Sequence, residues 1–320
     1  MAVTTARHVP VMIREVTDML RPRAGAVIVD ATLGLGGHAE ALLDAGATVV
    51  GLDRDPAALA AATDRLAAHG DRFHPVRTGF AELGTVLGGL GIPAADGVLY
   101  DLGVSSMQLD EGTRGFSYRH DAPLDMRMDT DGTVTAADVV NTWPVAELIR
   151  VLRAYGEERF APRIARAIET ARSRAAIETT GQLADLVRDA IPAAARRTGP
   201  HPARRTFQAL RIEVNSELDQ IARSLPQAID LLAPGGRVVV LSYHSLEDRI
   251  VKRTFADEAA GSVSPPELPL VVHRAPRLTL LTRRPLLPAA DEVAANPRAE
   301  SAKLRAAEKL PTPSNRSEGR

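Results

Sequence analysis

The sequence predicts an α/β fold with a Rossmann-like, mostly parallel sheet and an all-helical insert domain. Three observations support this fold. Short apolar runs alternate with helical stretches over residues 26–102, a glycine-rich turn follows the first run, and residues 110–211 hold helical patterns without a convincing strand. The 320 residues are 45% hydrophobic and 25% charged, a composition that can build a sizeable core.

The first half of the chain alternates regularly after an amphipathic helical pattern at residues 11–21. Four apolar runs predict strands at Ala26–Ala31, Thr48–Asp53, Phe73–Arg77 and Gly97–Leu102. Helices are predicted between these strands at His38–Ala45, Pro56–Ala68 and Phe80–Leu90. Gly46 ends the first of these helices, and Pro56 lies in the first turn of the second, as both residues commonly do.

The second half begins with the insert, whose helical patterns lie at residues 145–155, 159–174 and 180–191. A long helix at 212–232, a fifth strand at Gly236–Tyr243 and a helix at 246–259 follow. Two short apolar runs, Leu268–His273 and Leu278–Thr282, suggest a closing antiparallel pair. We therefore predict a core of residues 1–109 and 212–310, a substrate-recognising insert of residues 110–211, and a disordered tail of residues 311–320.

Composition excludes several classes of protein. The chain has no cysteine, which rules out disulfides, cysteine-ligated zinc, iron–sulfur clusters and thiol nucleophiles. A net charge of −1 argues against a generic polyanion binder, although local basic clusters can still contact nucleic acid. Because neither a signal peptide nor a run of about 18 apolar residues is present, we expect a cytoplasmic enzyme without a membrane partner.

The glycine-rich turn between Val27 and His38 is the most informative segment. Gly34 and Gly36 permit a tight turn and close approach of a ligand to the backbone. Ala39 completes a loose G-x-G-x-x-G/A pattern, which also fits dinucleotide enzymes. Asp30 is the sharper signal, because its carboxylate can accept hydrogen bonds from an ammonium group. The turn therefore favours S-adenosylmethionine, a cation with an amino-acid tail.

Asp53 ends the second strand, where an acidic residue can bind both ribose hydroxyls of an adenosine cofactor. The alternative role, capping of the next helix, is assigned to Asp55, which directly precedes Pro56. His38 opens a helix whose positive end disfavours an imidazolium, so we expect a neutral ring. Its backbone is expected to matter more than its ring.

Asp101 leaves the fourth strand at the carboxyl end, the edge that faces ligands in open α/β sheets. A carboxylate there can accept the N–H of an exocyclic base amine and favour its attack on a methyl carbon. Asp101 can instead hold the cofactor or merely cap the strand. Gln108, seven residues later in the same loop, can hydrogen-bond either ligand.

The loop after the fifth strand offers Tyr243 and His244 where a reacting base would enter. Tyr243 provides a stacking face of the kind that holds extruded bases. Ser245, with Glu247 and Asp248, can alternatively cap the next helix. A hydrolase triad is disfavoured, because His244 and Ser245 are adjacent and no G-x-S-x-G elbow is present.

Three basic clusters are candidates for contacts with a nucleic-acid backbone, although each alone is most often a solvated face. They are Arg196, Arg197, Arg204 and Arg205; then Arg274, Arg277, Arg283 and Arg284; then Arg298, Lys303 and Arg305. All three lie in the insert or the C-terminal half, away from the acidic cofactor half, which favours RNA or DNA contact.

Several long motifs resemble the bacterial ribosomal RNA small-subunit methyltransferase H family. They are Asp30–His38, Asp101–Asp110, Arg114–Tyr118, Leu124–Met128, Thr206–Asn215, Ser242–Arg249 and Asn296–Arg305, and the resemblance extends from His8 to Lys309. It implies a class I S-adenosylmethionine-dependent methyltransferase fold with a helical insert. The implied reaction is methylation of N4 of a cytidine in the decoding region of 16S rRNA.

The resemblance also implies a set of cofactor contacts, to which the glycine-turn argument adds Asp30 and Gly34 in support. The implied contacts are Gly36, Gly37, His38, Asp53, Phe80, Asp101 and Gln108. Three residues depart from the family pattern: Met107 replaces a common Pro, Tyr243 replaces the commoner Phe and keeps a ring, and Glu300 replaces Arg. The last change puts one RNA contact in doubt.

Within this hypothesis, Asp101 or His244 takes the proton from the methylated amine, and no metal is required. The RNA-contact candidates are Arg204, Arg205, Tyr243, Arg274, Arg298 and Lys303. The expected partner is 16S rRNA, within an assembled small ribosomal subunit. The sequence does not decide whether the protein forms a homodimer. Two other function classes are a nicotinamide-dependent oxidoreductase, which shares the glycine turn and Asp53, and an RNA-binding assembly factor without activity.

Overall fold

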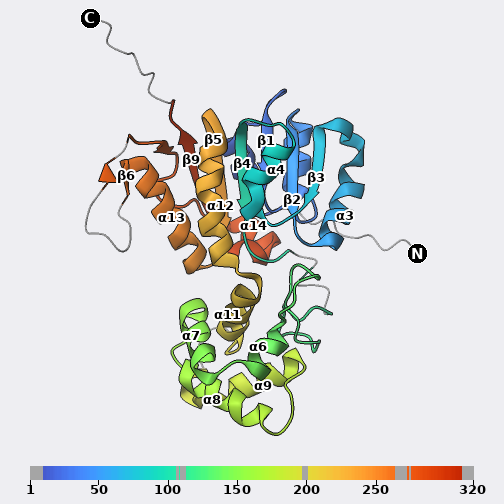
Figure 1. Cartoon of the computed structure of the whole chain (residues 1–320), viewed down its shortest axis with the longest axis vertical. Coiled ribbons are helices and arrows are strands. Elements are labelled where there is room, and N and C mark those ends of the chain that lie inside the picture. The colour runs from blue at the N-terminus through green and yellow to red at the C-terminus, as the bar shows by residue number, and fades with distance from the viewer. Residues whose placement is uncertain are drawn as a thin grey trace, which may run out of the picture. The chain divides into compact units, whose positions relative to one another are not determined.

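The computed structural model describes residues 10–105, 108, 113–196, 201–263, 272–273 and 275–311. The chain divides into two compact units (Figure 1). The sheet unit comprises Met1–Gly103 and Gln220–Arg320, and the helical unit comprises Val104–Asp219. The helical unit is wider than the predicted insert of residues 110–211, and residues 312–320 of the predicted tail lie outside the described residues.

The sheet unit is built on seven strands in the order β3-β2-β1-β4-β5-β9-β8, and the first five lie side by side in Figure 1. Their bounds are β1 (Val27–Asp30), β2 (Thr48–Asp53), β3 (Phe73–Arg77), β4 (Ala95–Asp101), β5 (Leu232–Ser242), β8 (Leu278–Leu280) and β9 (Lys303–Lys309). Strands β1 to β5 are parallel, whereas β9 is antiparallel to both β5 and β8. Because β1 pairs with both β2 and β4, the strand order reverses beside β1, where open α/β sheets bind ligands.

Helices that connect these strands include α1 (Ile13–Leu20), α2 (Gly37–Asp44), α3 (Pro56–Leu66), α4 (Leu83–Gly89), α12 (Glu217–Leu231), α13 (Ser245–Ala260) and α14 (Ala290–Ala295), with 3₁₀ turns at Ala67–Arg72, Phe80–Glu82 and Pro297–Ser301. The predicted cap of α3 is confirmed, because the Asp55 carboxylate accepts the Ala57 N–H at 3.1 Å. The helix predicted at 212–232 is confirmed over α12, but its predicted start is wrong. Two helices, α11 (Arg204–Asn215) and α12, are separated by Ser216 with φ of 49°.

The C-terminal strand pairing also differs from the prediction. Of the predicted run Leu268–His273, only Val272 and His273 are described. They form β7, which pairs with β6 (Ser262–Val263), whereas β8 pairs with β9. The sequence does not predict strand β9. Its KLRAAEK sequence mixes alanine with charges, so neither strand alternation nor β-branched enrichment marks it. Pairing with β5, whose inner residues are fully buried, selects the extended conformation.

The helical unit contains α6 (Ala136–Thr142), α7 (Val145–Gly156), α8 (Ala161–Arg172), α9 (Thr180–Ala190), α10 (Ala193–Arg196) and α11. The predicted helices at 145–155, 159–174 and 180–191 are confirmed as α7, α8 and α9. Side chains from α6 to α11 form a hydrophobic cluster of their own that includes Val151, Ile164 and Phe207. None of the helices within the described ranges is both long and apolar enough to cross a membrane.

Candidate active site

Two glycines of the turn between β1 and α2 have no room for a Cβ. Gly34 and Gly36 have φ of 51° and 76°, in the left-handed region that favours glycine. A Cβ on Gly36 would lie 2.9 Å from Leu66 Cδ1, and one on Gly37 would lie 2.5 Å from Pro10 Cγ. The bare backbone of this turn can therefore approach a ligand closely.

Two carboxylates, buried Asp30 and partly buried Asp53, lie at the ends of the neighbouring strands β1 and β2. Asp53 Oδ2 accepts the Gly34 N–H and its Oδ1 accepts the Asp55 N–H, both at 2.8 Å. Asp30 is 1% exposed, and its Oδ1 accepts the Thr32 N–H at 3.2 Å. Burial raises the pKa of Asp30 to about 7, and it also raises the pKa of Asp53. A cationic or hydroxyl-rich ligand would favour the charged forms of both groups.

Asp101 lies at the end of β4 between two ring side chains. The Tyr243 hydroxyl donates to Asp101 Oδ1 at 2.6 Å, and His38 Nε2 lies 3.5 Å from Asp101 Oδ2. The Asp101 N–H donates to Thr32 Oγ1 at 2.6 Å. The His38 side chain is 6% exposed, and within the described part of the chain neither ring nitrogen has a hydrogen-bond partner. The ring of His38, and not only its backbone, therefore faces the candidate site.

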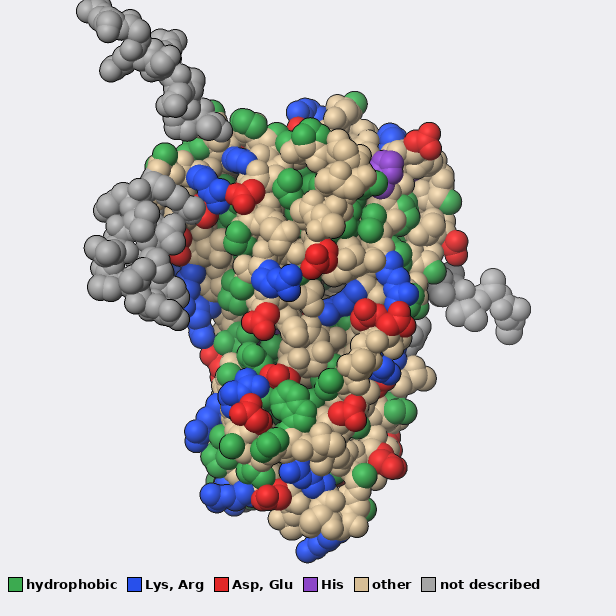
Figure 2. Space-filling model, viewed as in Figure 1, with side chains coloured by type: hydrophobic (Ala, Val, Ile, Leu, Met, Phe, Trp, Pro, Cys, Tyr) green, Lys and Arg blue, Asp and Glu red, His purple; other side chains and the backbone are tan. Residues whose placement is uncertain are grey.

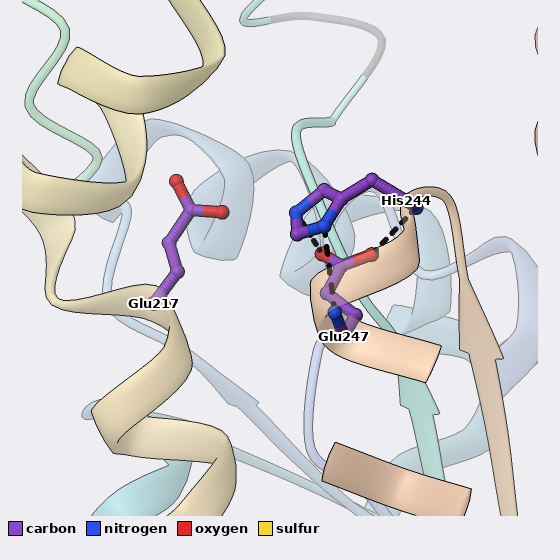
Figure 3. Close-up of side chains that lie close together, drawn as sticks. All are labelled: Glu217, His244 and Glu247. Carbon is purple, nitrogen blue, oxygen red and sulfur yellow. Dashed lines mark hydrogen bonds and ion pairs between the residues drawn. The ribbon is translucent and has the colours of Figure 1, made fainter. Parts of the chain in front are cut away.

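His244 lies at the start of α13 and caps that helix (Figure 3). Its Nδ1 accepts the Glu247 N–H at 3.4 Å, and Glu247 Oε2 accepts the His244 N–H at 3.1 Å. Figure 3 shows the His244 ring and the Glu247 carboxylate facing each other, with Nε2 3.2 Å from Oε1. The alternative in which Ser245 caps α13 is therefore not what the structure has. His244 is the N-cap, because its imidazole accepts the N–H three residues ahead.

Phe80 and Gln108 lie in different units. Phe80 opens the turn after β3, and its ring meets Tyr100 edge-on at 5.6 Å between centroids. Only the family resemblance pointed to Phe80, since an aromatic residue after a strand carries no local signal for a ligand. Gln108 belongs to the helical unit, where it is buried and accepts the Ser105 N–H at 3.1 Å. Its contact with a cofactor stays a prediction.

The candidate RNA-contact residues have different surroundings. Arg204 and Arg205 are exposed at the start of α11, and Arg205 Nη1 donates to the Glu157 carbonyl at 2.9 Å. Arg298 lies in the turn Pro297–Ser301, and Lys303 opens β9. Arg274 and Arg197 lie outside the described residues. Over the face drawn in Figure 2, Lys and Arg side chains are interspersed with Asp and Glu.

Carboxylates hold several members of the predicted basic clusters, among them Arg305, Arg277 and Arg196, which lies 3.6 Å from Asp189. The Arg305 side chain is 9% exposed and donates to Asp248 Oδ1 at 2.7 Å, so its assignment to an RNA-contacting face is wrong. Arg277 donates to Glu258 Oε2 at 2.6 Å and pairs with Asp230. Arg305 and Arg277 join α12 or α13 to the C-terminal strands, a role that depends on contacts distant in sequence.

The residues of the sheet unit fit a nucleoside cofactor with a cationic tail. The turn contains Gly34, Gly36 and Gly37, and the carboxylates of buried Asp30 and partly buried Asp53 can face cationic and hydroxyl groups. Buried His38 has ring nitrogens without a hydrogen-bond partner among the described residues. S-Adenosylmethionine carries a sulfonium, an ammonium and a ribose, which match these groups in chemistry.

Comparison with known proteins adds family membership. Residues 5–310 match the model of the MraW methylase family. The chain is 57% identical over 310 residues to ribosomal RNA small subunit methyltransferase H of Saccharopolyspora erythraea, covering 95% of this chain and 94% of that protein. It is 57% identical over 312 residues to the protein of the same name from Thermobifida fusca, covering 96% and 94%.

Among solved structures, the chain matches an rRNA methylase from Streptococcus thermophilus. The two are 12% identical, with a TM-score of 0.45, and the match covers 95% of this chain and 99% of that one. The family match over nearly the whole chain excludes the oxidoreductase alternative and confirms the predicted methyltransferase class. The chain therefore belongs to the MraW methylase family and is an S-adenosylmethionine-dependent methyltransferase.

Proposed function

We propose that this chain methylates N4 of a cytidine in 16S rRNA of the small ribosomal subunit. The names of its relatives support small-subunit rRNA as the substrate. The observation that carries the choice of an exocyclic amine is Asp101, a partly exposed carboxylate at the ligand-facing end of β4, beside His38 and Tyr243. A carboxylate in this place can accept an amine N–H, as nitrogen methylation requires.

The cytosine N4 lone pair is delocalised into the ring, so the amine is a weak nucleophile. Hydrogen bonding of N4–H to Asp101 would raise electron density on nitrogen and orient it for in-line attack. When bound, the cofactor would supply a methyl group carried on a sulfonium: the N–C bond would form as the C–S bond breaks, and the electron pair of the broken bond would stay on sulfur. The methylated amine then loses one proton, which Asp101 or His244 accepts.

The helical unit is proposed to recognise the RNA, with Arg204 and Arg205 contacting phosphates. Arg298, Lys303 and the Tyr243 ring are the proposed contacts from the sheet unit, together with Arg274, which lies outside the described residues. The proposed substrate is the assembled small subunit. The cofactor contacts proposed are Gly36, Gly37, His38, Asp53, Phe80, Asp101 and Gln108, supported by Asp30 and Gly34.

Replacing Asp101 tests this function. We expect Asp101→Ala to lower methyl transfer to small subunits by about 10²-fold or more, because the amine loses its acceptor. Mass spectrometry of the 16S rRNA measures N4-methylcytidine. Calorimetry with S-adenosylhomocysteine separates loss of chemistry from loss of cofactor binding.

Asp96→Asn is the matched control, because Asp96 lies at the other end of β4 and pairs with Arg23 at 3.0 Å. It should retain transfer. Unchanged turnover of Asp101→Ala would show that Asp101 is not the acceptor of the amine N–H. Binding of rRNA by the wild-type protein without incorporation of a labelled methyl group would favour an assembly factor.

A further inference from the structure

The Tyr243 hydroxyl holds one oxygen of the proposed amine acceptor. It donates to Asp101 Oδ1 at 2.6 Å, a short hydrogen bond to a carboxylate. Tyr243 follows β5 and Asp101 ends β4, and the two strands are paired with Asp101 opposite Leu241. The two side chains are thus brought together by parallel neighbours in the sheet, 142 residues apart in sequence.

The position of Tyr243 is fixed by its backbone as well. Its N–H donates to Glu247 Oε2 at 2.8 Å, and the same oxygen accepts the His244 N–H. Glu247 is itself buried at the start of α13. The Tyr243 ring is partly buried and packs against the hydrophobic cluster of the sheet unit. The ring therefore has little freedom to swing away from Asp101.

The protonation state of Tyr243 suits a permanent donor. Burial raises its pKa well above the ordinary value, and the carboxylates of Asp101, Glu247 and Glu292 act in the same direction. The phenol therefore keeps its proton throughout the physiological range. It can donate to Asp101 but cannot act as the base.

The second oxygen, Asp101 Oδ2, has a different neighbour. His38 Nε2 lies 3.5 Å away and makes no hydrogen bond within the described residues. The Asp101 side chain is 27% exposed, so the carboxylate is open to a ligand. With Oδ1 held by the phenol, Oδ2 is the oxygen that an entering amine can engage.

We infer that Tyr243 is a positioning residue, whose hydroxyl binds Asp101 Oδ1 so that Oδ2 faces the substrate amine. This inference rests on the proposed cytidine N4 methylation. It gives a role to the Tyr243 hydroxyl. Stacking of the ring on a base is a separate property, which phenylalanine would share.

The test compares Tyr243→Phe with the wild-type protein in single-turnover methyl transfer to small subunits, at saturating cofactor and RNA. We expect the rate to fall about tenfold, since one oriented hydrogen bond to a charged group is lost. Dissociation constants for S-adenosylhomocysteine and for the small subunit should change by less than about twofold, because ring packing and stacking persist.

Tyr100→Phe is the matched control. It removes the hydroxyl of a fully buried tyrosine on β4, one that bonds Ser224 Oγ and not Asp101. It should lower the midpoint of thermal unfolding while retaining the single-turnover rate. Tyr243→Phe should show the reverse pattern.

Two outcomes overturn the inference: an unchanged rate in Tyr243→Phe, or a fall in rate matched by an equal loss of cofactor or RNA affinity. The activity of the wild-type protein tests the proposed function separately. If wild-type protein forms no N4-methylcytidine, the proposed function fails, whatever the variant does.

Discussion

At the scale of single residues, Asp30 shows how burial prepares a site for a cation. Its carboxyl is 1% exposed at the end of β1, and burial raises its pKa to about 7, an effect partly offset by His38. The protein therefore holds Asp30 partly protonated near neutral pH. A ligand ammonium would restore the charged form, so cofactor binding and proton release are coupled.

The first prediction concerns the pH dependence of stability. Between the ordinary pKa of 3.8 and about 7, folded Asp30 keeps a proton that the unfolded chain has released. Its contribution to the free energy of unfolding is therefore complete below pH 3.8 and is lost as pH rises through about 7. Asp30→Asn removes this loss. As pH rises from 4 to 8, the free energy of unfolding of the variant should therefore increase by roughly 3–4 kcal/mol relative to that of wild type.

Urea unfolding of both proteins at several pH values measures this difference. Comparing variant with wild type cancels the titration of the other carboxyl groups. A difference that stays constant with pH would show that Asp30 has an ordinary pKa.

At the scale of elements, β9 shows how one ion pair joins a strand to a helix. Arg305 lies in the middle of β9 and its guanidinium contacts both carboxylate oxygens of Asp248 in α13, at 2.7 and 3.3 Å. The two side chains are 9% and 15% exposed. Neither charge is well hydrated, so each depends on the other.

The second prediction is that Arg305→Ala destabilises the protein by about 3 kcal/mol, because Asp248 is left buried without its partner. The double replacement Arg305→Leu with Asp248→Leu should recover most of this loss. Denaturant unfolding of the wild type, Arg305→Ala and the double variant measures these changes in the free energy of unfolding. Arg188→Ala, which breaks an exposed pair with Asp185, is the control and should leave the midpoint unchanged. Equal effects of the two alanine variants would contradict a buried role for Arg305.

At the scale of the whole molecule, most of the proposed cofactor contacts lie in the sheet unit, whereas the proposed RNA contacts come from both units. The sheet unit contains the glycine turn, Asp30, Asp53 and Asp101, and the helical unit has its own hydrophobic cluster. Net charge is −1, so attraction to RNA depends on local groups of arginines. Arg204 and Arg205 are an exposed adjacent pair of this kind.

The third prediction is that Arg204→Gln with Arg205→Gln weakens small-subunit binding and reduces the salt dependence of that binding by about one to two phosphate contacts. Affinity for S-adenosylhomocysteine should not change, because neither arginine is among the proposed cofactor contacts. Binding measured over a series of salt concentrations tests this. Arg188→Gln, an exposed arginine of the same unit already paired with Asp185, is the control. Unaltered RNA binding in the double variant would remove Arg204 and Arg205 from the interface.

The sequence by itself determined the parts that depend on local chemistry. The apolar runs of β1 to β4, the glycine turn and the Asp55 cap follow from steric limits and periodicity within a few residues, so they could be predicted. Tertiary structure decided the parts that depend on distant partners. Strand β9, the burial of Arg305, the break at Ser216 and the Tyr243–Asp101 hydrogen bond have no local signature. Their conformations are selected by free energy gained against residues far along the chain, which only the folded sheet brings into contact.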